Sequence, residues 1–270
     1  MRERVRTALA GLRKDGRKGL MPFITGGFPS LQATTETIIA LGGAGATAIE
    51  VGIPFSDPIA DGPVIAESMH KALSAGVDCA GVLSAVAGAR RAHEVPIVAM
   101  VSASILLRRG GGRFVAELAD SGFDGIIVPD IDLAWVDSIE GECDARGLSL
   151  SLLVAATTPH ARARELARHS RGFVYLLARQ GITGASGGAP NIAEPVAQLR
   201  KATDLPIAAG FGISTASHVA AVCAHADAAI VGSAYVKRMA GNDAVDQAIA
   251  LTRELSAGLV PRARASLGTQ

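Results

Sequence analysis

Short runs of β-branched and apolar residues recur along the whole chain, and segments with helical spacing of apolar residues lie between them. This alternation predicts βα units and a parallel sheet. Eight such runs are present: LMPFIT (20–25), TAIEVG (47–52), PIVAMV (96–101), GIIVPD (125–130), SLSLLVA (149–155), FVYLLA (173–178), PIAAGF (206–211) and AAIVGS (228–233). Eight βα units in one domain predict a (β/α)8 barrel, the TIM-barrel fold.

The predicted barrel occupies residues 1–270 as a single domain, because no linker, low-complexity tract or shift in composition divides the chain. The length of 270 residues suits the roughly 250 that such barrels use. Val5, Ala8, Leu9 and Leu12 follow helical spacing, which adds an N-terminal helix. The polar segment 261–270 is expected to be a frayed tail.

The alternative fold is an open, doubly wound sheet with a glycine-rich turn after its first strand. The stretch GGAGAT (42–47) resembles part of the G-x-G-x-x-G fingerprint, but it precedes a strand instead of following one. We therefore interpret it as a turn that ends a helix, and the barrel remains the better prediction.

Composition limits the classes of function. Hydrophobic residues make up 49% of the chain and the net charge is +1, so we expect a globular protein that binds neither nucleic acid nor a membrane surface. Cys79, Cys143 and Cys223 lack metal-binding spacing and are expected to be reduced core residues. No signal peptide and no run of about 18 apolar residues is found, so we expect a cytoplasmic location.

The stretch AIEVGIPFSDPIADGP (48–63) places a carboxylate inside an apolar strand. Because side chains alternate along a strand, Ile49 and Val51 should face the helices and Glu50 the upper barrel. In this fold the active site lies at the carboxyl ends of the strands. Burial there should raise the pKa of Glu50 toward neutrality, which suits a group that both accepts and returns a proton. A structural ion pair or a solvated edge position is the alternative.

Two more carboxylates follow in the loop. Asp57 precedes Pro58 and can simply shape a turn. Asp61 precedes Gly62 and Pro63, where it can be the N-cap of the next helix. Alternatively, Asp61 lies over the barrel mouth and holds a cationic or N–H-bearing group of a substrate.

The last two strands end in small residues, in AAGFGIS (208–214) and VGSAYVKRM (231–239). Glycines let backbone N–H groups approach a ligand, and the loops after strands 7 and 8 are the usual phosphate site of such barrels. Each glycine alone can simply make a tight turn. Together they predict a phosphate site at five residues: Gly184, Gly212, Ile213, Gly232 and Ser233.

The positions of the lysines and histidines exclude two kinds of catalytic mechanism. None of the five lysines lies in a predicted strand or at its carboxyl end, which argues against a Schiff base. The six histidines fall in or beside predicted helices, which argues against a metal cluster at the mouth. Acid–base chemistry by carboxylates on a phosphorylated substrate is the class that these patterns favour.

The stretch 48–63 also resembles the signature of the tryptophan synthase α subunit. The resemblance continues, in order, through MPFITGGFPS (21–30), ALSAGV (72–77), YLLARQGITGA (175–185), GFGIS (210–214) and VGSAYVKRM (231–239). It implies retro-aldol cleavage of indole-3-glycerol phosphate to indole and glyceraldehyde 3-phosphate, with neither a metal nor an organic cofactor. It also implies a partner, the pyridoxal-phosphate β subunit, in an assembly of two α and two β subunits.

The resemblance implies a role for individual residues as well. Glu50 would be the acid/base and Asp61 the acceptor of the indole N–H, with Tyr175 completing the catalytic group. Thr183 would help to organise Asp61, and Asp57 would belong to the loop that communicates with the partner. The indole pocket would be lined by four apolar residues: Phe23, Ile127, Leu177 and Phe211.

One segment departs from the family pattern. Where the family shows a Met-x-Tyr-x-Asn-Pro type run ending in Tyr-Gly, this chain reads MVSASILLRRGG (100–111). Ser102, Ser104, Ile105 and Arg109 replace the expected residues in the segment that reaches the β subunit. The alternatives to an α subunit are therefore a stand-alone lyase that releases indole and a catalytically idle barrel that regulates a partner.

Overall fold

The computed structural model describes residues 3–58, 61–178, 192–210 and 212–259, and it contains one parallel sheet. The order of the strands around the sheet is β5-β4-β3-β2-β1-β9-β8-β7-β6. Their bounds are β1 Gly19–Thr25, β2 Ile49–Gly52, β3 Ile97–Met100, β4 Gly125–Ile127, β5 Ser149–Ser151, β6 Leu153–Ala155, β7 Val174–Leu177, β8 Ile207–Gly210 and β9 Ala228–Val231. This arrangement confirms the predicted barrel.

The strand count differs from the prediction at the fifth run, which divides into β5 and β6 around Leu152. The two pieces pair with opposite neighbours, β5 with β4 and β6 with β7. The Leu152 carbonyl accepts a hydrogen bond from the Tyr175 N–H (3.2 Å), and the Leu152 N–H donates one to the Ser170 hydroxyl (3.3 Å). One continuous segment therefore closes the ring, with a local break in the regular ladder.

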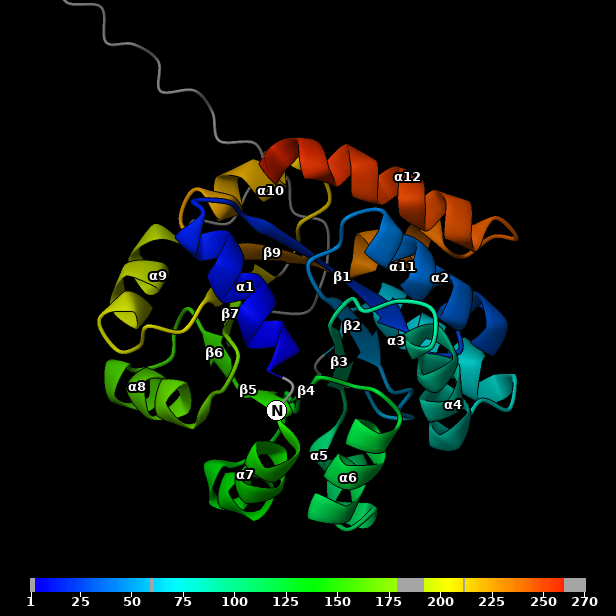
Figure 1. The fold of residues 1–270 in the computed structure, drawn as a ribbon, viewed down its shortest axis with the longest axis horizontal. Coiled ribbons are helices and arrows are strands. Elements are labelled where there is room, and N and C mark those ends of the chain that lie inside the picture. The colour runs from blue at the N-terminus through cyan, green and yellow to red at the C-terminus, as the bar shows by residue number, and fades with distance from the viewer. Residues whose placement is uncertain (1–2, 59–60, 179–191, 211, 260–270) are drawn as a thin grey trace, which may run out of the picture.

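Helices surround the barrel and one of them crosses its base (Figure 1). The helix bounds are α1 Arg4–Lys14, α2 Leu31–Gly43, α3 Pro63–Ser74, α4 Cys79–Arg90, α5 Ala103–Arg108, α6 Gly112–Asp120, α7 Leu133–Arg146, α8 His160–His169, α9 Ala193–Arg200, α10 Ala216–Cys223, α11 Ser233–Arg238 and α12 Ala244–Ser256, followed by a 3-10 turn Ala257–Leu259. The predicted N-terminal helix is α1. It buries Val5 and Leu9 among the inward side chains of the strands and so closes the amino end of the barrel.

The strands alternate as the sequence pattern requires. Ile49 and Val51 belong to the large cluster between the sheet and the helices, whereas Ala48 belongs to the cluster inside the barrel. Glu50 is on the same face of β2 as Ala48 and is 0% exposed. The prediction that Glu50 points into the barrel is therefore confirmed.

Two matching ion-pair clamps fasten the amino ends of the strands. In the first, Asp124 accepts from Arg90 and from the backbone N–H of Ile97, the first residue of β3. In the second, Asp227 accepts from Arg200 (2.5 Å) and from the N–H of Ile207, the first residue of β8 (2.8 Å). The sequences that lead into these strands also correspond, RRAHEVPI (90–97) and RKATDLPI (200–207).

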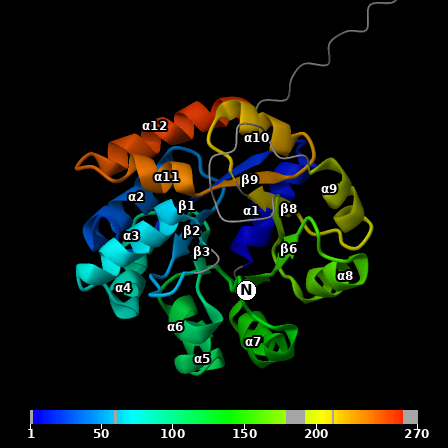
Figure 2. The same cartoon turned by 180° about the vertical axis from the view of Figure 1, so that it is seen from behind.

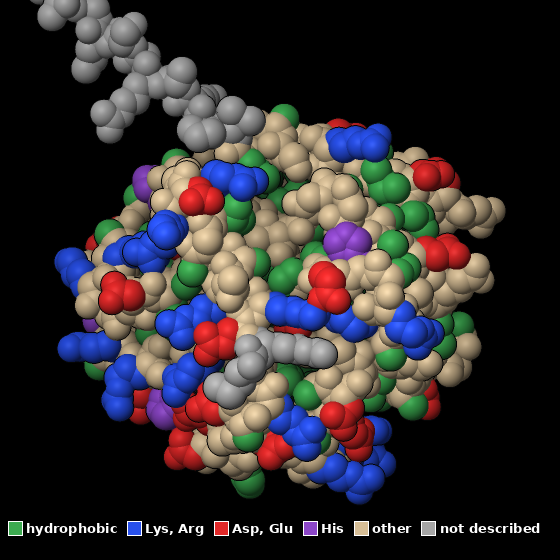
Figure 3. Space-filling model, in the orientation of Figure 1, with side chains coloured by type: hydrophobic (Ala, Val, Ile, Leu, Met, Phe, Trp, Pro, Cys, Tyr) green, Lys and Arg blue, Asp and Glu red, His purple; other side chains and the backbone are tan. Residues whose placement is uncertain are grey.

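The face that carries α1 shows basic and acidic side chains interspersed (Figure 3), which agrees with the absence of a one-signed field in the composition. Within the described ranges, no single helix is long and apolar enough to cross a membrane. α3 and α4 together have sufficient length and apolar content, but they meet at an angle of 101° and both bury residues in the core.

Candidate active site

Glu50 lies in β2 between two apolar neighbours, since it is in register with Phe23 of β1 and Val98 of β3. Both of its carboxylate oxygens are buried, and neither has a hydrogen-bond partner among the residues that the structure describes. Removal from water disfavours the charged form, so burial raises the pKa of Glu50 from 4.5 to about 8. A structural ion pair, the alternative interpretation of Glu50, is not formed within this part of the chain.

Asp61 is in the loop between β2 and α3, partly buried, with its backbone N–H bonded to the Pro58 carbonyl (3.0 Å). The N-cap of α3 is Gly62, and Pro63 is the first helical residue. The alternative of Asp61 as the N-cap is therefore wrong. Burial first, and then the negative charge of Asp130, raises the pKa of Asp61 from 3.8 to about 6.

Tyr175 reaches the same region from β7, which lies between β8 and β6 in the sheet. Figure 2 shows β6 and β8 across the barrel from β2. Burial, followed by the charges of Glu50 and Asp61, raises its pKa well above 10. The structure thus brings together the three residues predicted to be catalytic. Gly210 of β8 leaves room for this side chain, because a Cβ atom at position 210 would lie 2.7 Å from the Tyr175 hydroxyl.

The predicted apolar wall is partly described. Ile127 and Leu177 lie with Tyr175 in the cluster inside the barrel. Phe23 packs with Ile65 and Met69 of α3, which extends over β1. A Cβ atom at Gly52 would lie 2.6 Å from the Phe23 ring, so this glycine makes room for the ring. Phe211 lies outside the described residues.

The predicted phosphate site is also partly described. Gly212 has φ +69°, in the left-handed region that favours glycine, and Ile213 is buried. Gly232 is the N-cap of α11, and Ser233 is its first residue. No side chain among the described residues caps the first N–H groups of α11. Thr183 and Gly184 lie outside the described residues.

The segment that was expected to depart from the family pattern contains a short helix, α5, which is capped at its amino end. Ser102 is the N-cap of α5 and its hydroxyl accepts from the Ile105 N–H (3.3 Å). Arg109 then donates to Glu117 (2.6 Å) and lies over the Phe114 ring at 5.1 Å. Asp57, in the loop between β2 and α3, is exposed.

Sequence reasoning missed Asp130. It stands three residues beyond β4, and it acts electrostatically on Asp61. The available signal was its place at the end of the predicted strand run GIIVPD, where a carboxylate meets the same criterion that identified Glu50.

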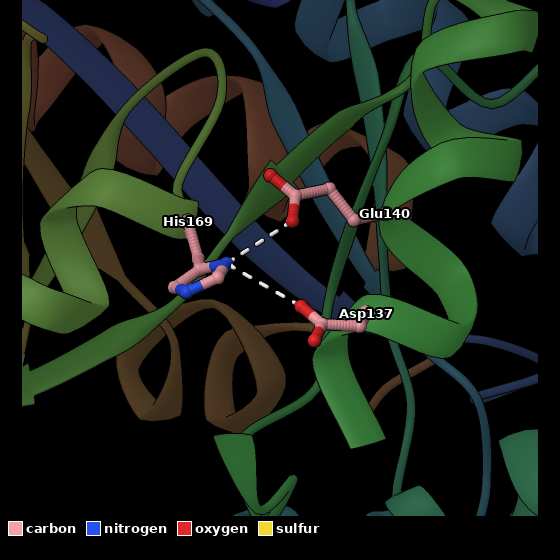
Figure 4. A group of neighbouring side chains, drawn as sticks. All are labelled: Asp137, Glu140 and His169. Atoms are coloured by element: carbon pink, nitrogen blue, oxygen red, sulfur yellow. Dashed lines mark hydrogen bonds and ion pairs between the residues drawn. The ribbon is translucent and has the colours of Figure 1, made fainter. Parts of the chain in front are cut away.

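Asp137, Glu140 and His169 form a second polar cluster, on α7 and α8 outside the barrel (Figure 4). His169 Nδ1 lies 3.0 Å from Glu140 Oε2 and 3.9 Å from Asp137 Oδ1. Glu140 also accepts from the Arg171 guanidinium at 2.6 Å. The arginine already supplies a positive charge to this carboxylate, so we interpret the cluster as a salt-bridge network that joins two helices.

The two carboxylates of the site have pKa values on opposite sides of neutrality. At pH 7 a Glu50 with a pKa of about 8 is mostly protonated, whereas an Asp61 with a pKa of about 6 is mostly ionised. Groups whose pKa values are pushed apart in this way can serve as a proton donor and an anionic acceptor at one pH. The parallel barrel and this pair of carboxylates define an acid–base enzyme of the (β/α)8 class.

Comparisons with known proteins identify the family. The sequence model described as "Tryptophan synthase alpha chain" matches residues 9–260. The tryptophan synthase alpha chain of Chloroflexus aggregans is 42% identical over 93% of this chain and 96% of its own length. That of Geobacter sulfurreducens is 40% identical over 87% of this chain and 89% of its own length.

Solved structures agree. A crystal structure of tryptophan synthase from M. tuberculosis, in an aminoacrylate-bound form, matches with a TM-score of 0.85 and 30% identity, over 95% of this chain and 99% of that one. A mutant tryptophan synthase alpha-subunit from Pyrococcus furiosus matches with a TM-score of 0.82 and 33% identity, over 89% and 98% of the two chains. The chain belongs to the tryptophan synthase alpha chain family, and it is a lyase of tryptophan biosynthesis.

Proposed function

We propose that this chain cleaves indole-3-glycerol phosphate to indole and glyceraldehyde 3-phosphate, with Glu50 as the acid/base, and that it works as the α subunit beside a β subunit. The observation that carries the assignment of Glu50 is its carboxylate, which is fully buried and has no hydrogen-bond partner in the described part of the chain. Such groups are costly to bury and concentrate at functional sites. An idle regulatory barrel would have no use for one.

Glu50 alone can carry out both proton transfers of the reaction. Protonated Glu50 donates its proton to C3 of the indole ring, which leaves Glu50 as a carboxylate and the ring with a positive charge. The carboxylate then removes the proton of the side-chain hydroxyl next to the scissile bond. The C–C bond breaks, its electron pair returns to the ring, and the products are indole and the aldehyde. Glu50 is protonated again, and the cycle uses neither a metal nor an organic cofactor.

Asp61 has a complementary task. As an anion it accepts a hydrogen bond from the indole N–H and stabilises the positive charge that develops on the ring. A charge held in a partly desolvated position is worth more than the same charge in water. We assign Tyr175 to complete this group, and the walls of the indole pocket to Phe23, Ile127, Leu177 and Phe211.

The same proposal covers the phosphate group of the substrate, the contact with the β subunit and the location of the protein in the cell. Thr183 would help to organise Asp61, and the phosphate would be held by backbone N–H groups at Gly184, Gly212, Ile213, Gly232 and Ser233. Asp57, on its exposed loop, would take part in communication with the β subunit. We propose a cytoplasmic location, as suits a pathway of soluble intermediates.

Steady-state release of indole tests the proposal. We expect weak turnover by the isolated chain and a large increase when a tryptophan synthase β chain is added. Glu50→Gln should abolish turnover while substrate still binds. Glu67→Gln is the matched control, because Glu67 is exposed on α3 and pairs with Lys71 (2.7 Å). We expect kcat/KM to rise with pH as Asp61 ionises near pH 6 and to fall as Glu50 loses its proton near pH 8.

The outcomes separate the alternatives. Appreciable turnover that the β chain does not change would identify a stand-alone lyase instead. No indole under either condition would overturn both versions, and near-normal activity of Glu50→Gln would remove Glu50 from the mechanism.

A further inference from the structure

Three neighbouring strands bring three loops together at the mouth of the barrel. Gly52, Met100 and Ile127 are in register at the ends of β2, β3 and β4. The pairing continues one residue further, from the Ile53 N–H to the Met100 carbonyl (2.8 Å) and from the Val101 N–H to the Ile127 carbonyl (3.0 Å). The loop that carries Asp61, the start of α5 and the loop that carries Asp130 therefore leave the barrel side by side.

Asp130 is fastened to α5. Its Oδ1 accepts a hydrogen bond from the backbone N–H of Ala103 at 2.8 Å, and Ala103 is the first residue of that helix. Asp130 itself is exposed, and this hydrogen bond orients its carboxylate toward the amino end of α5. The bond connects a residue of the site region to the segment 100–111, which departs from the family pattern.

The charge on Asp130 also reaches Asp61. Like charges disfavour ionisation, so Asp130 adds to the effect of burial and raises the pKa of Asp61 further. The other titratable groups that interact with this site, among the described residues, are Glu50 and Tyr175. An anion with a higher proton affinity is a stronger acceptor for the indole N–H, so the repulsion benefits the proposed reaction.

We propose that Asp130 is a positioning residue that connects α5 to Asp61: α5 fixes the Asp130 carboxylate, and that carboxylate sets how strongly Asp61 holds the indole N–H. The inference rests on the proposed function of Asp61. It follows that a displacement of α5, the helix within the segment expected to reach a partner, alters the active site without any direct contact with the substrate.

Two substitutions test separately the charge that Asp130 exerts on Asp61 and the hydrogen bond by which α5 holds Asp130. Asp130→Asn keeps an oxygen that can accept from Ala103 but removes the charge. Ala103→Pro keeps the charge but removes the N–H that holds it, at the first helical position, where proline is well tolerated. Ser102 already has the extended conformation (φ −69°, ψ 148°) that a residue before proline requires.

The readout is the acid limb of the pH profile of kcat/KM for indole release, which a purely structural role would not shift. We expect Asp130→Asn to move this limb to lower pH by about half a unit. Ala103→Pro should move it in the same direction. Asp132→Asn is the control, because Asp132 is two residues away but caps α7 through Ala134 (2.9 Å); its acid limb should coincide with that of the wild type. Circular dichroism and thermal unfolding verify that each variant is folded.

Each result decides one part of the inference. An unshifted acid limb in folded Asp130→Asn would overturn the electrostatic connection, and a shift in Asp130→Asn with none in Ala103→Pro would overturn the role of α5. An equal shift in Asp132→Asn would show a general effect of charge and would overturn the inference as well. Asp61→Asn distinguishes the underlying proposal: if that variant keeps full activity and its acid limb, the assignment of Asp61 fails first.

Discussion

Glu50 shows how far single residues could be predicted. Its inward direction followed from the alternation of Ile49, Glu50 and Val51, because every second side chain of a barrel strand faces the same side. Spacing could not decide between a cap and a binding residue at Asp61, since that choice depends on where helix α3 begins. Only the family resemblance favoured a binding role for Asp61. Asp130 was missed because its partners, Ala103 and Asp61, are remote in sequence.

At the same scale, the buried carboxylate should cost stability in a way that depends on pH. The folded-state pKa of Glu50 is about 8 against an ordinary 4.5, so between these values the folded chain holds a proton that the unfolded chain has released. Stability therefore falls as the pH rises through this window. Glutamine does not titrate, so the advantage of Glu50→Gln over the wild type should grow by a few kcal/mol from about pH 5 to 8. Urea unfolding at several pH values measures it, with Glu67→Gln as control; a pH-independent difference would contradict the raised pKa.

At the scale of elements, the number of βα units was predictable because the apolar runs are strong and the turns between them are polar or rich in glycine. The break at Leu152 was not, because the run SLSLLVA is uniform and its division depends on which neighbour each half pairs with. The helix α1 was predicted from spacing alone. Its position across the base of the barrel depends on the apolar opening beneath it, which the linear sequence does not display.

The contribution of α1 to the stability of the barrel can be measured by shortening one of its buried side chains. Leu9 is 1% exposed among the inward residues of the strands, whereas Leu12, one turn further along, is only partly buried. We expect Leu9→Ala to lower the free energy of unfolding by about 3 kcal/mol, through lost burial and the cavity left behind. Leu12→Ala should cost clearly less. Chemical denaturation of both variants tests this, and equal losses would mean that α1 does not seal the barrel in the way its contacts indicate.

At the scale of the whole molecule, each of the two ion-pair clamps stabilises a different half of the barrel. Asp124 ties β3 through Arg90, and Asp227 ties β8 through Arg200. The strand order places β3 and β8 two positions from β1 on opposite sides. Each clamp therefore holds a different part of the ring.

Because the clamps share no residue, their contributions should be independent. Replacing Asp124 or Asp227 by Asn removes the carboxylate charge that pairs with Arg90 or with Arg200, which should cost about 3 kcal/mol in each case. The double variant should lose close to the sum of the two, as expected for separate sites. Denaturant unfolding of the two single variants and the double variant measures this. A double loss far from the sum would show that the clamps act as one unit.

The location of these clamps has a consequence for the evolution of such a chain. Both clamps, together with the α1 plug, lie at the amino ends of the strands, and Glu50, Asp61 and Tyr175 gather toward the opposite end. Loops at the catalytic rim can therefore be exchanged, lengthened or rewritten without loosening the ring that holds them. The stretch 100–111, which contains α5, starts at this rim. Chimeras that graft the rim from relatives should keep a sound barrel while changing what docks on it.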